Sequence, residues 1–431
     1  MELGQIAVIG NYLPRKCGIA TFTTDLSDSL VALKGEDACF TIAVSDTDQT
    51  YDYPDRVRFE IREGDPSSYR RAADYLNLSN VDVICLQHEF GIFGGTSGSY
   101  ILRLLREVRA PVVTTLHTIL REPSASQRQV LEEIARLSDR LVVMSSRALD
   151  YLRDIYQVPA DKIDLIPHGI PDVPFVDTNF YKDHFGLEGK TVILTFGLLS
   201  PNKGIEHAIR ALPPVVERHP DVVYLVLGAT HPQVRREQGE SYRDSLKKLA
   251  QDLGVSEHVM FIDEFVSLER LTEYIGAADI YVTPYLNEQQ IVSGTLAYAT
   301  GAGKAVVSTP YWYAEELLSE ERGLLAPFGD SKAMADQITS LLDQDVPRNA
   351  MRKRAYLYAR NMIWPEVGRR YLESFDKARE CRHLRPTLFS GSHVSSASKT
   401  LPALNLQHLL QMTDNTGMLQ HAVYGLSLIH I

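Results

Sequence analysis

The stretch of residues 290–309 carries the groups best suited to bind an anion. Ser293, Gly294 and Thr295 are expected to open a helix that Gly301 ends, and a β-branched apolar run follows it. A helix opening leaves several backbone N–H groups unpaired, with the positive end of the helix dipole behind them. We therefore expect a phosphate or diphosphate to bind here, with Gly294 allowing close approach to the backbone. The alternative is that Ser293 is an ordinary helix cap.

Two further glycines follow apolar runs that resemble buried strands. Gly18 comes after the first run of the chain and leads into a predicted helix, so a ligand could approach the N-terminus of that helix. Gly197 comes after a later run, and Lys203 stands shortly beyond it. We expect Lys203 to reach the same anion as residues 293–295, so that a cation and backbone donors act together. A solvated surface lysine is the alternative.

Polar residues also end two apolar runs in the first half of the chain. His88 and Glu89 follow one run, and His117 follows the next. Ligands of parallel α/β sheets bind beyond the carboxyl ends of the strands. These three residues are therefore candidates for contact with a ligand, while a structural role for each histidine is the alternative.

Other motifs are rejected. No Gly-x-Gly-x-x-Gly follows the first apolar run, so the dinucleotide fingerprint is missing. Gly189, Lys190 and Thr191 resemble the end of a P-loop, but the first glycine of that motif is absent. Asp46 and Asp48 lie in a polar loop, and no His/Cys cluster has metal-ligand spacing. We expect no metal.

The composition is that of an ordinary soluble protein, with 44% apolar and 23% charged residues among 431. A formal net charge of −11 without a basic block argues against a nucleic-acid partner. The four cysteines are scattered, which favours reduced thiols. Neither a signal peptide nor a transmembrane segment is visible, so we expect a cytoplasmic protein.

Buried apolar runs alternate with amphipathic segments along most of the chain. Such alternation predicts parallel sheets in a doubly wound α/β fold. The pattern restarts after the segment of Pro167, His168 and Gly169, which predicts two Rossmann-like domains. The predicted strands are 6–9, 81–86, 112–116, 141–144, 191–196, 222–227, 259–262, 280–283 and 305–308.

The predicted organisation has five parts. An N-terminal Rossmann-like domain covers residues 1–170, and a second one covers residues 171–380 with a closing helix over 364–378. Residues 381–403 are polar and are expected to form a linker. Residues 404–425 begin a new helical pattern, and residues 426–431 resemble in-frame read-through of a sequencing adapter. We expect 404–425 to be the start of a truncated helical module.

These features together resemble a known family. The Gly18 loop, the His117 strand end, the segment 167–169, the pair of Gly197 and Lys203 and the strand after Gly303 occur in the order of a retaining glycosyltransferase of glycosyltransferase family 4, with the GT-B fold. The resemblance covers roughly residues 5 to 380. It implies two Rossmann-like domains that face each other across a cleft.

The resemblance also implies an activity and roles for residues. A hexose would move from a nucleotide-diphosphate sugar, of the GDP-mannose or UDP-glucose type, to a carbohydrate acceptor, with no cofactor and no metal. Catalytic roles fall to His117 and Lys203, and His88 and Glu89 are candidates for the acceptor or the sugar. The residues implied in donor binding are Gly18, Gly197, Lys203, Gln290, Ser293, Gly294, Thr295, Leu296 and Tyr298.

The sequence departs from the family pattern at three positions. Leu198 stands where the family has an arginine, and Gln290 and Tyr298 stand where it has two glutamates. The usual ribose-binding carboxylate is thus unassigned, and one cation is lost. The chain is then either a member of a divergent bacterial subfamily with its own donor contacts or a nucleotide-sugar or glycan binding module without turnover. A sugar phosphorylase of the same fold is a separate alternative.

Overall fold

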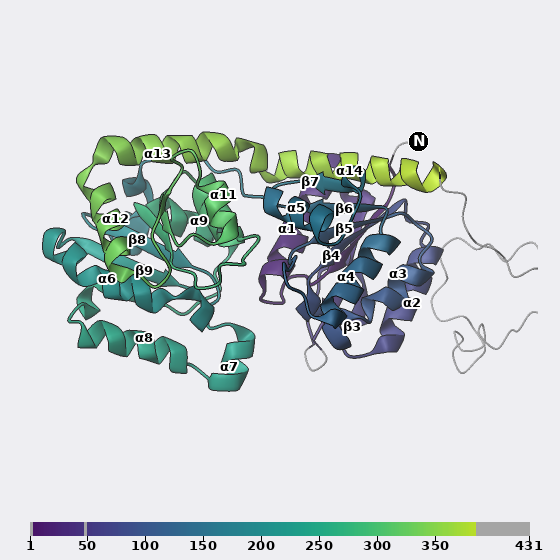
Figure 1. Ribbon diagram of the computed structural model, residues 1–431, viewed down its shortest axis with the longest axis horizontal. Helices are drawn as coiled ribbons and strands as arrows, with labels where there is room; N and C mark the ends of the chain where they lie inside the picture. Colours follow the sequence, from purple (N-terminus) through teal and green to yellow (C-terminus); the bar gives the residue numbers. More distant parts are fainter. Residues whose placement is uncertain (1–2, 47–49, 385–431) are drawn as a thin grey trace, which may run out of the picture. The chain divides into compact units, whose positions relative to one another are not determined.

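The computed structural model describes residues 3–46 and 50–384, which form two parallel β-sheets with helices on both faces of each (Figure 1). This arrangement confirms the predicted doubly wound α/β class with two Rossmann-like domains. The predicted linker, helical module and adapter read-through lie outside the described residues, apart from residues 381–384.

The first sheet has the order β3-β2-β1-β4-β5-β6-β7, and every neighbouring pair is parallel. Three of its strands were not predicted: β2, the edge strand β3, in which exposed side chains alternate, and the short strand β7. The strands are β1 (Ile6–Gly10), β2 (Cys39–Ser45), β3 (Val57–Arg62), β4 (Val83–His88), β5 (Val112–Leu116), β6 (Arg140–Val143) and β7 (Ile163–Leu165).

Helices cover both faces of this sheet. One face packs against α1 and α14, where Phe22 and Tyr371 join Val8 in one apolar cluster. The other face packs against α2, α3 and α4, where Tyr69 and Leu104 belong to a second cluster. The helices are α1 (Gly18–Lys34), α2 (Pro66–Leu78), α3 (Ile101–Glu107), α4 (Ala125–Leu137), α5 (Ser146–Asp154) and α14 (Trp364–Leu384).

The second sheet has the order β10-β9-β8-β11-β12-β13, again with parallel neighbours. Its predicted strands are confirmed, and only the two-residue strand β13 was missed. The strands are β8 (Thr191–Phe196), β9 (Val222–Leu227), β10 (Val259–Ile262), β11 (Ile280–Thr283), β12 (Ala305–Ser308) and β13 (Leu324–Leu325).

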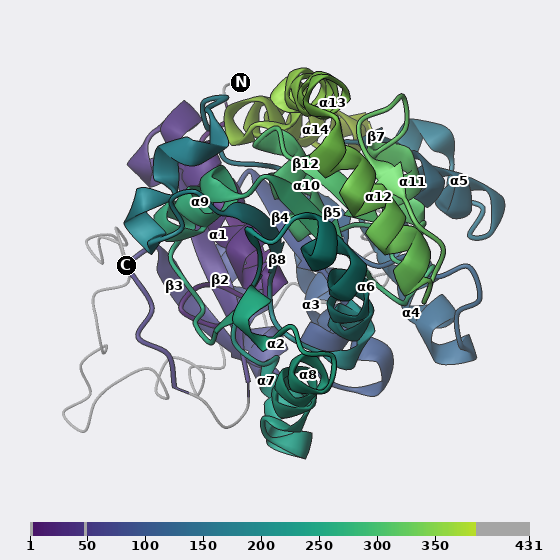
Figure 2. The ribbon, with the colours of Figure 1, turned by 90° about the vertical axis from the view of Figure 1, so that its left-hand side faces the viewer.

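Two layers of helices also enclose the second sheet. On one face α6 packs against α8 and α12 (Figure 2). On the other face α9, α10 and α11 supply apolar side chains to a separate cluster. The helices are α6 (Ile205–Arg218), α7 (Pro232–Gln238), α8 (Ser241–Asp252), α9 (Leu268–Ala277), α10 (Gly294–Gly301), α11 (Trp312–Leu317), α12 (Ser331–Asp343) and α13 (Asp345–Tyr358).

The chain returns to the first sheet at its last described helix. The predicted closing helix is longer than expected, since α14 runs on to Leu384, and it packs against α1, β4, β5 and β6. The Tyr371 hydroxyl lies 2.8 Å from Thr115 Oγ1, and Ser374 Oγ donates to Asp164 at 2.8 Å. Most of the helix α14 falls within the predicted second domain, residues 171–380, but its contacts place it with the first sheet.

Candidate functional site

Both sheets reverse their strand order at one point, between β1 and β4 in the first and between β8 and β11 in the second. At such a switch point the loops leave in opposite directions and open a crevice beyond the carboxyl ends of the strands. Gly18 follows β1, His88 is the last residue of β4 and Glu89 follows it, while Lys203 follows β8 and the N-terminus of α10 follows β11. The topology therefore places the predicted residues at two switch points.

Lys203 ends a short 3-10 turn, Pro201–Lys203, which lies against the segment that follows β11. The backbone N–H of Leu286 donates to the Asn202 carbonyl at 3.1 Å. Gly204 has a φ of +60°, and a Cβ placed there would lie 2.1 Å from the Pro284 carbonyl oxygen. Only glycine allows this close approach, so the turn determines where the Lys203 side chain begins.

A chain of polar contacts joins Lys203 to the first turn of α10. Lys203 Nζ donates to the Tyr285 hydroxyl at 2.6 Å, and that hydroxyl lies 2.7 Å from Thr295 Oγ1. Thr295 Oγ1 lies 3.2 Å from Ser293 Oγ, which accepts the Leu296 N–H at 3.3 Å. The structure thus brings together Lys203 and the predicted helix opening, with Tyr285 between them.

Charge and burial oppose each other at Tyr285. Burial by itself would raise the pKa of the Tyr285 phenol, but the ammonium of Lys203 beside it holds that pKa below its usual value. The Lys203 ammonium also lies 3.9 Å from the centroid of the Tyr285 ring, within the range of a cation–π contact.

Ser293 is the N-cap of α10, which agrees with the alternative interpretation of Ser293 as an ordinary helix cap. Its side chain accepts the Leu296 amide, so this predicted donor is already engaged within the helix. The amides of Gly294 and Thr295 open the helix and by geometry have no partner inside it. Capping and anion binding are therefore compatible at this helix N-terminus.

Gly294 has a close neighbour that the sequence did not reveal. A Cβ placed at Gly294 would lie 2.9 Å from His168 Nε2, well inside ordinary contact distance. The His168 Nδ1 lies 2.7 Å from the Gly169 carbonyl oxygen, and burial lowers the pKa of His168 to about 4. Space for the neutral imidazole is thus one reason for glycine here, beside the predicted approach of a ligand.

Gly197 and Gln290 lie beside this region of the second sheet. Gly197 has a φ of +122°, and a Cβ there would lie 3.2 Å from Thr295 Cγ2, so its backbone is close to the opening of α10. Gln290 Nε2 donates to the Val292 carbonyl at 3.1 Å.

The side chain of Tyr298, which the family resemblance implied in donor binding, points away from Lys203 and toward α1. It is 6% exposed, and its hydroxyl donates to Asp25 Oδ2 in α1 at 2.7 Å. Burial raises the pKa of the Asp25 carboxyl to about 6. The Tyr298 side chain therefore connects α10 to α1 and does not enter the contacts around Lys203.

His117, the candidate residue that follows β5, is held by a hydrogen-bonding partner and by ring contacts. Its Nε2 lies 3.0 Å from Gln87 Oε1, and its ring meets the edge of Phe22 at 4.8 Å. Burial, reinforced by His168 and His88, lowers the pKa of His117 to about 3. A neutral imidazole can form hydrogen bonds with a hydroxyl group but contributes no positive charge at physiological pH.

His88 and Glu89 differ in their surroundings. His88 is 0% exposed, and within the described part of the chain neither of its ring nitrogens has a hydrogen-bond partner. Its ring contacts the rings of both Phe90 and Phe93, which favours a structural role for His88. Glu89 is half-buried and accepts Thr118 Oγ1 at 2.6 Å, and burial raises the pKa of its carboxyl.

Gly18 opens α1, and Cys17 Sγ caps that helix by accepting the Ala20 N–H at 3.3 Å. Apart from its chain neighbours and the backbone of its own helix, no heavy atom of the described residues lies within 4 Å of the place that a Cβ at Gly18 would take. The space beside this helix N-terminus is therefore open, as the approach of a ligand would require.

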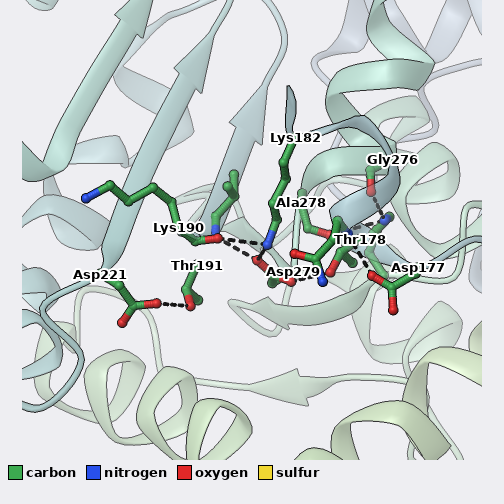
Figure 3. A network of polar contacts seen from close by, with 12 residues as sticks. Asp177, Thr178, Lys182, Lys190, Thr191, Asp221, Gly276, Ala278 and Asp279 are labelled. Atoms are coloured by element: carbon green, nitrogen blue, oxygen red, sulfur yellow. Dashed lines mark hydrogen bonds and ion pairs between the residues drawn. The ribbon is translucent and has the colours of Figure 1, made fainter. Parts of the chain in front are cut away.

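A dense network of buried charge lies at the opposite end of the second sheet (Figure 3). Asp279 accepts Lys182 Nζ and the Val192 N–H, both at 2.8 Å. Lys304 Nζ donates to the Gly276 carbonyl at 2.7 Å, and burial lowers the pKa of Lys304 to about 7. Because these residues precede β8, β11 and β12, they lie at the amino ends of the strands, away from the switch point.

Sequence reasoning missed Tyr285, Asp25 and the role of His168. The position of Tyr285 just after β11 was the one signal available, because polar residues at strand ends gather at the switch point. In residues 3–46 and 50–384, no group of three or more His, Cys, Asp and Glu could hold a metal ion. Over the same residues, no helix is long and apolar enough to span a membrane.

Comparison with known families gives two matches that together span most of the chain. Residues 177–358 match the family described as glycosyl transferases group 1, and residues 17–172 match the family described as glycosyltransferase family 4. One relative is a phosphatidyl-myo-inositol mannosyltransferase of Mycolicibacterium smegmatis, 24% identical over 72% of this chain and 75% of the relative. Another is a D-inositol 3-phosphate glycosyltransferase of Corynebacterium efficiens, 28% identical over 64% of this chain and 68% of the relative.

Solved structures share the fold at low sequence identity. Sucrose-phosphate synthase of Thermosynechococcus elongatus aligns with a TM-score of 0.69 and 17% identity, over 86% of this chain and 98% of that chain. The Anabaena protein HepE in complex with UDP-glucose aligns with a TM-score of 0.67 and 16% identity, over 86% of this chain and 99% of that chain. The likeness extends over both sheets.

Proposed function

Since the chain belongs to the GT-B glycosyltransferases of family 4, we propose that it moves a hexose from a nucleotide-diphosphate sugar to a carbohydrate acceptor with retention at the anomeric carbon. The observation that carries this proposal is the chain of contacts from Lys203 through Tyr285 to Thr295, at the N-terminus of α10. It combines a cation with unpaired helix amides at a switch point, which suits a diphosphate.

The donor diphosphate would lie on Lys203 and the amides that open α10. As the bond between the anomeric carbon and the diphosphate oxygen breaks, negative charge grows on the leaving group. Lys203 and the positive end of α10 would stabilise that charge without a metal ion. The Anabaena protein HepE, which shares the fold, has a solved structure in complex with UDP-glucose, and this supports a nucleotide-sugar donor.

The acceptor would lie on the first sheet, near His117 and Glu89. Its hydroxyl oxygen would bond to the anomeric carbon on the face from which the diphosphate leaves, and its proton would pass to a diphosphate oxygen. The low pKa of His117 keeps its imidazole neutral, so its proposed role is a hydrogen bond to a sugar hydroxyl. GDP-mannose is the first donor to test, because the relatives include a mannosyltransferase, and UDP-glucose is the second.

Calorimetric titration with GDP, UDP and ADP, followed by their sugars, tests this proposal. We expect one diphosphate to bind, Lys203→Ala to weaken its binding, and transfer to persist in excess chelator. Lys203→Ala should lower turnover by about 10²–10³, the scale of one preorganised electrostatic contact. Lys247→Ala is the matched control, since it removes an exposed lysine from α8. Failure of every diphosphate to bind at millimolar concentration would contradict the proposal.

A further inference from the structure

Tyr285 stands between the only two groups that the proposed donor site assigns to the diphosphate, the Lys203 ammonium and the opening of α10. We propose that Tyr285 is a positioning residue, which holds the Lys203 ammonium in place and orients the hydroxyl groups of Thr295 and Ser293 toward a bound diphosphate. This inference rests on the proposed function and adds a residue that neither the family pattern nor the sequence reasoning had assigned.

The phenol of Tyr285 is held independently of Lys203. The residue is 1% exposed, and its ring stacks on Tyr311 with the centroids 5.3 Å apart. Its carbonyl oxygen accepts Thr309 Oγ1 at 2.6 Å, which ties the segment after β11 to the segment after β12. The hydroxyl is therefore a fixed point to which a flexible lysine can be attached.

The direction of the hydrogen bonds follows from the charge of Lys203. An ammonium group donates and cannot accept, so the Tyr285 oxygen must be the acceptor in the contact at 2.6 Å. The Tyr285 proton is then free to bond to Thr295 Oγ1, and the Thr295 proton can bond to Ser293 Oγ. Ser293 Oγ also accepts the Leu296 N–H.

This order leaves donors at the end of the chain of contacts. Because Ser293 Oγ accepts from both Thr295 and Leu296, its own proton points away from these partners. The Ser293 hydroxyl, the remaining N–H groups of Lys203 and the first amides of α10 are then all donors. A diphosphate is an acceptor at every oxygen, so the arrangement is complementary to it.

Tyr285→Phe tests this role because it removes the hydroxyl and keeps the ring stacked on Tyr311. The probes are inorganic pyrophosphate, the nucleoside diphosphate that the parent binds, and the corresponding nucleoside. We expect the Kd for both diphosphates to rise about 10–100-fold, as for the loss of a hydrogen bond to a charged group. The nucleoside, which has no phosphate, should bind as it does to the parent.

Two further variants make the outcome specific. Tyr224→Phe is the matched control, because the Tyr224 hydroxyl is also buried and also contacts a threonine, Thr195 at 2.8 Å. It should keep the parent affinity for every probe. In a background of Lys203→Ala, Tyr285→Phe should have a smaller effect on diphosphate affinity than in the parent, because one of the two groups that Tyr285 positions is already gone.

The results separate this inference from the proposed function. If the parent binds no diphosphate, the proposed function and this inference both fail. If the parent binds and Tyr285→Phe keeps its diphosphate affinity, or loses nucleoside affinity to the same extent, the positioning role alone is overturned. Should Tyr285→Phe fail to fold, Thr295→Val removes the other partner of the phenol, and unchanged diphosphate affinity in that variant would overturn the role equally.

Discussion

Gly294→Ala should destabilise the protein through a contact with His168. The added Cβ would lie 2.9 Å from His168 Nε2 and 3.2 Å from Cε1, so the imidazole has to withdraw. It has little freedom, because its Nδ1 is 2.7 Å from the Gly169 oxygen and its ring packs against Phe22 and Tyr298. Overpacking of this kind costs about 1–3 kcal/mol, which corresponds to a melting temperature lower by about 2–12 °C.

Scanning calorimetry of five proteins tests the explanation: the parent, Gly294→Ala, Gly18→Ala, His168→Ala and the double variant of Gly294→Ala with His168→Ala. Gly18→Ala is the matched control, since Gly18 also begins a helix and, among the described residues outside its chain neighbours and its own helix backbone, no heavy atom lies within 4 Å of the added Cβ. His168→Ala removes the obstacle, so Gly294→Ala should cost much less in that background than in the parent. Equal losses in the two backgrounds, or a Gly294→Ala variant as stable as Gly18→Ala, would refute the reasoning.

Three further predictions concern other parts of the structure. The pKa of Lys304 is about 7 in the folded protein and 10.5 in a free lysine. Between these two pH values the unfolded chain binds one proton more than the folded chain, so the melting temperature of the parent should rise with pH. Lys304→Met should abolish this rise. Asp164→Asn should reduce the free energy of unfolding in urea by about 3–5 kcal/mol, because it leaves the buried Arg140 without its ion pair. The Arg140 and Ser374 contacts hold the pKa of Asp164 below its usual value despite burial, so the parent should lose this contribution as the pH falls through that pKa. Gly204→Ala should raise the Kd for pyrophosphate in calorimetry, since its Cβ would meet the Pro284 carbonyl at 2.1 Å and displace Lys203; an unchanged Kd would show that this turn does not place the lysine.

Much of the fold follows from local patterns in the sequence. The predicted strands 112–116, 191–196, 222–227, 259–262, 280–283 and 305–308 have the observed bounds. Buried strands of a parallel sheet are continuous apolar runs, and this signal does not depend on distant partners. The prediction missed the strand β3 because it lacks this signal: its exposed side chains break the apolar run.

The sequence also determined which residues could gather at the proposed donor site. Strand ends in a parallel sheet lie at one edge, so the order of the chain alone predicts that Lys203 after β8 and Ser293 after β11 lie near each other. The capping role of Ser293 could be predicted from its position directly before an apolar helix.

Only the tertiary structure decided how the side chains pair. Helical spacing could not reveal that Tyr298 contacts Asp25, or that the room at Gly294 is taken by His168, because both contacts join segments far apart in the chain. Tyr285 likewise became a candidate only when its hydroxyl was found between Lys203 and Thr295. Local sequence sets backbone conformation and burial, whereas the partner of a buried polar atom depends on which elements the packed core places beside it.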